Sequence, residues 1–228
     1  MNIENSKYSG IYFLWLGKRK LILTRNLTPG IKLFNEDLIL DKDNNTEYKV
    51  FDPYRSKYSS AIMQKILNLP IKENDIILYL GASHGYTCSF LSDIIKENGF
   101  IFALDVSARV VRDLVKICEV RKNICPLLLD ANKPEKYKDK IVKVDVIYQD
   151  IAQRNQIDIF LKNVDLFLKN NGYCILCVKS RSIDVTKNPR EIYKIVEKEL
   201  IGNRLKIIDF KTLDPFQKDH GFFVCQKK

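Results

Sequence analysis

The chain has 228 residues, of which 46% are hydrophobic and 29% charged, so it can bury a core and is not a disordered protein. Lys and Arg outnumber acidic residues by 38 to 28, and the net charge of +10 suits a polyanionic partner, although the excess is spread along the chain. The apolar run IYFLWL at 11–16 is too short to cross a membrane. We therefore expect a soluble, cytoplasmic protein with no membrane partner.

The first 50 residues contain short β-type runs, at 10–16 and 21–24, and turn-forming residues, which predicts a small antiparallel β domain. Beyond residue 55, strand and helix patterns alternate, which favours a mostly parallel sheet with helices on both faces. The expected strands are 76–80, 100–104, 127–129, 144–148, 173–178, 204–211 and 220–226, the last two as a hairpin. The expected helices are 59–67, 90–95, 110–118, 157–168 and 189–200. The predicted domains are 1–53 and 54–228.

The six cysteines lie mostly within apolar runs, which is typical of reduced, buried thiols. Cys174 and Cys177 have CxxC spacing, but they belong to a strand pattern, in which residues three apart point to opposite faces of the sheet. Neither a disulfide nor a metal site is therefore expected at this pair.

Two glycines, Gly81 and Gly85, follow the apolar run at 76–80, at the turn where an open α/β sheet usually binds its ligand. Their GxxxG spacing differs from the GxGxxG of dinucleotide-binding enzymes and disfavours a dehydrogenase. Asp105 ends the next strand, where a carboxylate can accept both hydroxyls of a ribose, and Asp130 ends the third. These features favour a nucleoside site over a purely structural turn.

Six ordered blocks cover nearly the whole chain: DPYRSK (52–57), YLGASHGYTCSFLSDII (79–95), LDANKPEKY (129–137), VDVIYQDIAQRNQ (144–156), VKSRSID (178–184) and LDPFQKDHGFFV (213–224). Their sequence and order resemble the fibrillarin-like RNA 2′-O-methyltransferases. The resemblance implies a class I, Rossmann-like methyltransferase with a seven-stranded, mostly parallel sheet, S-adenosylmethionine as cofactor and a small N-terminal β domain. With 9 glycines and no RGG tract, the chain is similar to the archaeal form.

The resemblance also implies the residues that contact the cofactor. They are Gly81, Ala82, Tyr86 and Thr87 along the methionine and ribose, Asp105 and Val106 at the adenosine, Asp130 and Ala131 beside the adenine, and Asp150, Ile151, Ala152 and Gln153 near the methyl group. Where the family commonly has GAASGTT, this chain has GASHGYT. It has Asp105 in place of the usual Glu, and LDAN (129–132) in place of GDAR. We expect these differences to affect cofactor affinity and not cofactor identity.

A catalytic tetrad is implied by the same resemblance and maps to Lys57, Asp150, Lys179 and His220. Our hypothesis is that Lys179 accepts the proton of the ribose hydroxyl in its neutral form, with a pKa lowered by Lys57 and the sulfonium. Asp150 would orient Lys179, and His220 would position the ribose or relay the proton. Without the resemblance, Lys179 would be read as a solvated charge, His220 as a turn residue and Asp150 as a helix cap.

Substrate RNA is expected over the carboxyl edge of the sheet, where basic side chains can contact phosphates. The candidates are Arg55, Lys57, Lys179, Arg181 and Lys218. Few aromatic residues interleave these charges, so the sequence suggests no base reader. The resemblance implies that a box C/D guide RNA selects the target, together with a Nop-family scaffold protein and a kink-turn-binding ribosomal-type protein.

The expected activity is therefore guide-directed 2′-O-methylation of ribosomal RNA, with transfer RNA as a further candidate substrate. Two alternatives stay open: a methyltransferase acting on protein or a small molecule, and a non-catalytic RNA-binding subunit. Dependence on a guide RNA distinguishes the expected activity from methylation of protein or a small molecule. Binding of the cofactor distinguishes the expected activity from a non-catalytic RNA-binding role.

Overall fold

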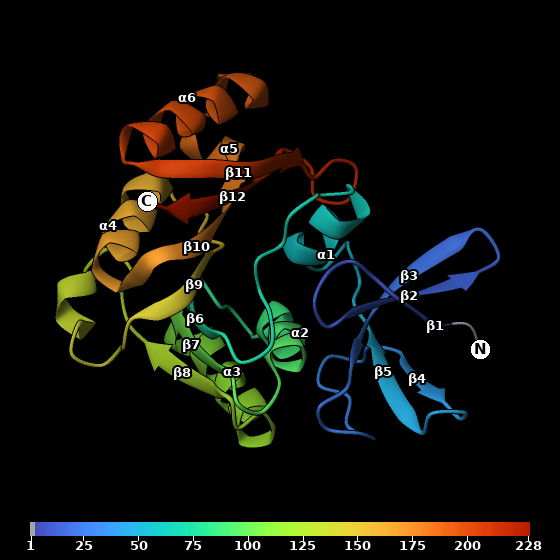
Figure 1. Cartoon of the computed structure of the whole chain (residues 1–228). Helices are drawn as coiled ribbons and strands as arrows, with labels where there is room; N and C mark the ends of the chain where they lie inside the picture. The colour runs from blue at the N-terminus through green and yellow to red at the C-terminus, as the bar shows by residue number, and fades with distance from the viewer. Residues whose placement is uncertain (1–2) are drawn as a thin grey trace.

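The computed structural model describes residues 3–228, whose strands form two sheets (Figure 1). The smaller sheet is antiparallel, with the order β1-β2-β3-β5-β4. Its strands are β1 (Ile3–Asn5), β2 (Ile11–Leu16), β3 (Arg19–Arg25), β4 (Leu38–Asp41) and β5 (Thr46–Val50). The prediction of a small N-terminal antiparallel sheet is confirmed.

The larger sheet has seven strands in the order β11-β12-β10-β9-β6-β7-β8. Its parallel strands are β6 (Ile76–Leu80), β7 (Phe100–Asp105), β8 (Ile124–Leu128), β9 (Val144–Gln149) and β10 (Leu168–Lys179). The antiparallel hairpin is β11 (Leu205–Thr212) and β12 (His220–Lys227), which joins the sheet beside β10. This arrangement confirms the predicted α/β class and the terminal hairpin.

Helices cover both faces of the larger sheet (Figure 1). The helices are α1 (Lys57–Met63), α2 (Tyr86–Ile95), α3 (Ala108–Val120), η1 (Pro134–Tyr137), α4 (Gln156–Phe167), α5 (Ser180–Ile183) and α6 (Pro189–Gly202). One hydrophobic core lies under α1, α2 and α3, and a second lies under α4 and α6. Cys174 belongs to the second core and Cys177 to the first, so the two thiols lie on opposite faces of β10, as predicted. Within residues 3–228 no helix is long and apolar enough to span a membrane.

Element boundaries differ from the sequence prediction where tertiary packing sets them. The third parallel strand begins at Ile124 instead of residue 127 and includes Pro126. Proline lacks a backbone donor and is tolerated there because β8 is the edge strand. Helix α1 ends at Met63, four residues before the predicted end, because Lys65 has a left-handed backbone with a φ of 56°.

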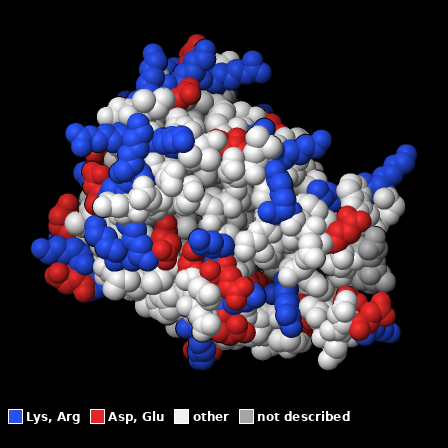
Figure 2. Space-filling model, viewed as in Figure 1, with Lys and Arg blue, Asp and Glu red and all other residues white. Residues whose placement is uncertain are grey.

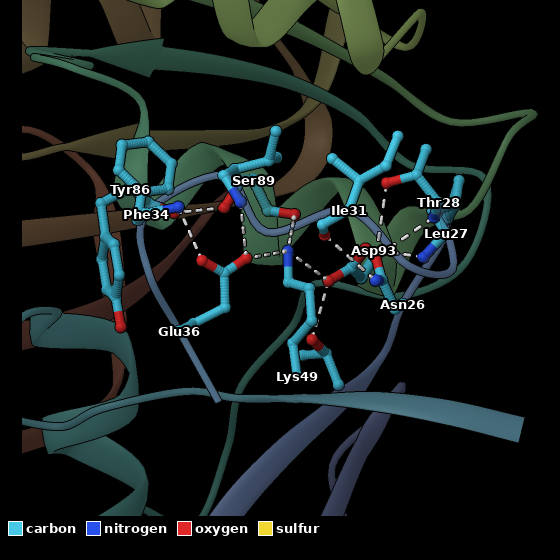
Figure 3. A network of polar contacts seen from close by, with 12 residues as sticks. Asn26, Leu27, Thr28, Ile31, Phe34, Glu36, Lys49, Tyr86, Ser89 and Asp93 are labelled. Carbon is cyan, nitrogen blue, oxygen red and sulfur yellow. Dashed lines mark hydrogen bonds and ion pairs between the residues drawn. The ribbon is translucent and has the colours of Figure 1, made fainter. Parts of the chain in front are cut away.

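The small sheet is fastened to the larger domain by a buried cluster of charges (Figure 3). Asp93 of α2 accepts from Lys49 Nζ of β5 at 3.0 Å and from the Thr24 hydroxyl of β3 at 2.8 Å. It also accepts from the Leu27 amide at 3.1 Å and pairs with Arg121 at the end of α3. Every charged side chain of this cluster is buried, so Asp93 is the anion that offsets two cations held away from water.

Replacing Asp93 with Ala should lower the free energy of unfolding by roughly 3–5 kcal/mol, because Arg121 would stay buried without its carboxylate and Lys49 would keep only the more distant Glu36. Urea unfolding followed by circular dichroism measures this change. The matched control is Asp158→Ala, which removes an exposed carboxylate paired with Lys162 on α4 and should change stability little. Similar small losses for both variants would contradict the buried-cluster account.

Candidate cofactor and catalytic site

The first turn after β6 brings the backbone of two strands unusually close together. Gly81 has a φ of +81°, and a Cβ at this position would lie 2.5 Å from the carbonyl oxygen of Asp150 and 2.9 Å from Ile151 Cγ1. Gly85 has a φ of +89° and precedes α2 directly, and its Cβ would lie 2.7 Å from Leu114. Both glycines are therefore required by backbone conformation and by close approach.

A cavity of about 240 Å³ opens at the carboxyl ends of β6, β7, β8 and β9. Its lining includes Asp105, Val106, Asp130, Ala131, Ile151, Ala152 and Gln153. Asp105 accepts from the amides of Ser83 at 2.9 Å and Ser107 at 3.0 Å, which fixes its carboxylate at this edge. A hydrogen bond from the Asn132 amide holds the pKa of Asp130 below its usual value, so the Asp130 carboxyl group stays ionised.

A larger cavity of about 780 Å³ lies on the other side of the glycine turn. Its lining includes Lys57, Gly81, Ala82, Tyr86, Thr87 and Asp150. Gly81, Ser83 and Asp150 line both cavities, which makes them two lobes of one site. All twelve residues predicted to contact the cofactor line one lobe or the other.

One wall of the larger lobe comes from the small sheet, which the sequence did not suggest. Leu33 and Phe34, between β3 and β4, line this lobe, and the Phe34 ring meets Tyr86 edge to face with centroids 5.4 Å apart. The carboxylate of Glu36 accepts from the amides of Leu33 and Phe34 and lies 3.9 Å from Lys49 (Figure 3). The buried charge cluster therefore extends to the wall of the site. No periodicity or motif could have revealed Phe34 as a lining residue.

The four predicted catalytic residues come from four elements and meet at one sheet edge. Lys57, the first residue of α1, pairs with Asp150 after β9, and the Nζ–Oδ2 distance is 2.8 Å. Lys179 and His220 face each other as paired residues of β10 and β12. Burial lowers the pKa of Lys57, but attraction to Asp150 outweighs it, so the pKa is raised and Lys57 stays an ammonium.

His220 is coupled electrostatically to the other three residues. Its pKa is lowered, first by burial and then by the charge of Lys57, with a smaller lowering by Lys179 and an opposing effect of Asp150. Its Nδ1 lies 2.7 Å from the carbonyl oxygen of Lys218. Because a carbonyl can only accept, Nδ1 carries the proton, and Nε2 of the neutral ring has the free lone pair.

The hypothesis that Asp150 orients Lys179 stays a prediction. The contact that the structure shows for the Asp150 carboxylate is with Lys57, through Oδ2. The reason is that the N-terminus of α1 places Lys57 directly over the end of β9, a contact between segments far apart in sequence.

Several predicted RNA-binding side chains are already engaged within the protein. Arg55 donates to the Phe34 carbonyl at 3.0 Å and lies over the Tyr86 ring at 4.1 Å, and Arg181 pairs with Asp219 at 3.1 Å. Lys218 and Lys179 are exposed. In the view of Figure 2, Lys and Arg side chains are interspersed with Asp and Glu, and they do not gather into one basic block.

The fibrillarin family model matches residues 3–228. The chain belongs to the fibrillarin family. Among curated fibrillarin relatives, the fibrillarin-like rRNA/tRNA 2′-O-methyltransferase of Thermococcus onnurineus is 44% identical over 228 residues and that of Pyrococcus abyssi 44% over 229. The first alignment covers 100% of both chains, and the second covers 100% of this chain and 99% of the relative.

Solved fibrillarin structures agree with the fold along the whole chain. The Methanococcus jannaschii fibrillarin pre-rRNA processing protein superposes with a TM-score of 0.94 at 41% identity and covers 100% of this chain and 98% of its own. Aeropyrum pernix fibrillarin, solved with natively bound S-adenosyl-L-methionine, superposes with a TM-score of 0.90 at 39% identity. The match covers 99% of this chain and 98% of that one. The fibrillarin of a fibrillarin/Nop5p complex superposes with a TM-score of 0.86 at 37% identity. The match covers 96% of this chain and 98% of that one. The predicted family and fold are confirmed.

Proposed function

We propose that the chain methylates ribose 2′-hydroxyls of RNA with S-adenosylmethionine as methyl donor, as the catalytic subunit of a guide-RNA-directed box C/D particle. Ribosomal RNA is the expected substrate and transfer RNA a further candidate. The observation that carries the proposal is the two-lobed site, with the Lys57–Asp150 ion pair at the junction of its lobes. The names of the curated relatives support the reaction type.

The residues of the site fit the proposed cofactor. The smaller lobe has a fixed carboxylate, Asp105, at the position where a ribose is expected, and the missing Cβ of Gly81 leaves an open backbone at the junction of the lobes. Asp105 stands where the family usually has Glu. It keeps a carboxylate as hydrogen-bond acceptor, but its side chain is shorter by one methylene. Natively bound S-adenosyl-L-methionine in Aeropyrum pernix fibrillarin supports the cofactor prediction.

The four residues of the tetrad would divide the catalytic work. When bound, the sulfonium supplies an electrophilic methyl group. Lys57, kept protonated, holds Asp150 in place and stabilises negative charge that develops on the ribose oxygen. Lys179 adds positive charge from the adjoining strand, beside His220.

Proton acceptance is assigned in this proposal to His220 and not to Lys179. Neutral His220 has its lone pair on Nε2, because Nδ1 donates to the Lys218 carbonyl. Its lowered pKa keeps it neutral at physiological pH, so it can accept the 2′-hydroxyl proton without a prior deprotonation step. A lysine ammonium would first have to lose its own proton.

The partners of this proposal are a Nop-family scaffold protein, a box C/D guide RNA and a kink-turn-binding protein. The solved fibrillarin/Nop5p complex supports the scaffold for a relative with 37% identity. With no base reader evident in the catalytic cavities, guide pairing would choose the target ribose.

The Gly81→Ala variant should lose S-adenosylhomocysteine binding by tenfold or more in calorimetry, because the added Cβ would displace the Asp150 backbone. The matched control is Gly30→Ala, since Gly30 has the same φ of +81° but nothing within 4 Å of its added Cβ. The control should bind with wild-type affinity. Equal losses in both variants would show that the lobe junction does not depend on Gly81.

The single-turnover methylation rate should be constant above about pH 6.5 and should fall at lower pH, because protonation removes the Nε2 lone pair of a histidine with a lowered pKa. His220→Ala should slow the reaction by roughly 10²- to 10⁴-fold and remove this acid limb. Lys179→Ala should slow the reaction but keep the limb. A wild-type rate that climbs through pH 8–10 would instead assign proton acceptance to Lys179.

Methyl transfer from labelled S-adenosylmethionine should require the scaffold, the kink-turn-binding protein and a guide paired to the target. Shifting the guide pairing by one nucleotide should move the modified ribose by one nucleotide. Efficient, site-specific methylation by the chain alone would contradict the proposed particle, and cofactor binding without any transfer would favour the non-catalytic alternative.

A further inference from the structure

The tips of strands β9 and β10 separate at the sheet edge that carries the catalytic residues. The parallel pairing of these strands ends with Gln149 beside Leu176. Beyond that pair, Asp150 turns toward β6, where its amide donates to the Leu80 carbonyl at 2.9 Å. Strand β10 continues to Lys179, which pairs with β12 on its other side. The backbone ladder between β9 and β10 therefore stops before it can fix Lys179 relative to Asp150.

A buried glutamine side chain spans this gap. Gln156, the first residue of α4, is fully buried. Its Oε1 accepts from the Lys179 amide at 3.2 Å, and its Nε2 donates to the Lys179 carbonyl at 3.4 Å. The same Nε2 donates at 2.8 Å to the carbonyl of Gln153, in the loop that follows Asp150. One side chain thus joins the backbone of a tetrad residue to the loop that lines the smaller lobe.

The bridging residue is itself held in place. The Gln149 side chain, also fully buried, donates to the Gln156 carbonyl at 2.6 Å. The Gln156 backbone amide donates to the Gln153 carbonyl at 3.2 Å, and α4 packs against β9 and β10 (Figure 1). Buried polar networks whose members are satisfied are rigid. Gln156 can therefore fix the position of Lys179 instead of moving with it.

Both segments that Gln156 contacts carry parts of the proposed reaction. Residues 151–153 line the cofactor lobe, and Lys179 lies beside His220 on β12. Within residues 3–228, the exposed Lys179 ammonium has no hydrogen bond or ion pair that would fix it. The reach of this ammonium is therefore set by its backbone, which is the part that Gln156 holds.

We propose that Gln156 is a positioning residue for methyl transfer, whose side-chain amide sets the distance between the backbone of Lys179 and the cofactor loop. The inference rests on the proposed function and deepens it. Misplacement by about 1 Å can slow a reaction by roughly 10²-fold, so a fixed distance at this edge affects the rate. Gln156 lines neither lobe, and it acts through Lys179.

The test replaces Gln156 with Met, which has a similar length but makes none of the three side-chain hydrogen bonds. In the reconstituted particle, Gln156→Met should lower the single-turnover methylation rate by roughly 10- to 100-fold. Calorimetry with S-adenosylhomocysteine should give an affinity within about threefold of wild type, because the backbone amide at 156 still holds the Gln153 carbonyl. Equal losses of rate and affinity would indicate collapse of the cofactor loop and would overturn the inference.

Asn123→Leu is the matched control. Asn123 is a buried amide that directly precedes β8, at the opposite end of the parallel strands from the site. Its side chain also makes three hydrogen bonds, two to the carbonyls of Ser92 and Lys96 and one from the Ser92 hydroxyl. This variant should lose stability in thermal unfolding but keep the wild-type methylation rate. Similar slowing in both variants would reflect a general loss of structure and would overturn the inference.

A double variant shows whether Gln156 acts through Lys179. Lys179→Ala removes the ammonium that Gln156 is proposed to position. Adding Gln156→Met to Lys179→Ala should therefore slow the reaction further by less than about twofold. Two effects that multiply in full would contradict action through Lys179.

Hydrogen exchange of the Lys179 amide tests the contact without any methyl transfer. NMR of the full chain with isotopically labelled lysine should show a protected Lys179 amide in wild type and in Asn123→Leu, with exchange at least about tenfold faster in Gln156→Met. Rapid exchange in wild type would overturn the inference, whether or not the variants fold. A protected amide without transfer by wild type would contradict the proposed function and support the contact. Transfer by Gln156→Met at the wild-type rate would support the proposed function and overturn the inference.

Discussion

The geometry of the site depends on one backbone contact, between the turn after β6 and the end of β9. The Asp150 amide donates to the Leu80 carbonyl at 2.9 Å, and the missing side chain of Gly81 lets the Asp150 carbonyl sit against the turn. This contact holds the Asp150 carboxylate at the boundary of the two lobes, within reach of Lys57. Two neighbouring parallel strands therefore set both the shape of the cavity and the position of its main ion pair.

Much of the fold and part of the site could be predicted because they follow from local pattern. Buried parallel strands are short apolar runs, and their carboxyl ends meet at one edge, so Asp105, Asp130 and Asp150 could be placed together from sequence. The predicted limits of strands and helices were wrong where tertiary packing overrides the sequence pattern. β10 begins at Leu168, five residues before the predicted strand, and its pairing with β9 shifts register before Tyr173. No local signal specifies that extension.

Other features of the site arise only when distant segments meet. Phe34 lines the larger lobe, and its amide donates to the Glu36 carboxylate. Tyr54 contacts Phe216, which lies far along the chain. No local sequence pattern indicates the Tyr54–Phe216 contact, because the two residues belong to segments far apart in the chain. The tautomer of His220 likewise depends on the Lys218 carbonyl, which constrains the ring only in the folded loop. Such pairings are properties of the tertiary fold and not of periodicity.

The charge cluster around Asp93 also limits how this protein can be recombined with its relatives. Lys49 comes from the small sheet, whereas Asp93 and Arg121 come from the larger domain, and Asn26 of the small sheet accepts from Arg121 at 2.8 Å. A chimera that exchanged only the N-terminal sheet would keep the Asp93–Arg121 pair but would take the residues at positions 26 and 49 from another parent. Crossover points are thus restricted to pairs of parents that share this four-residue arrangement.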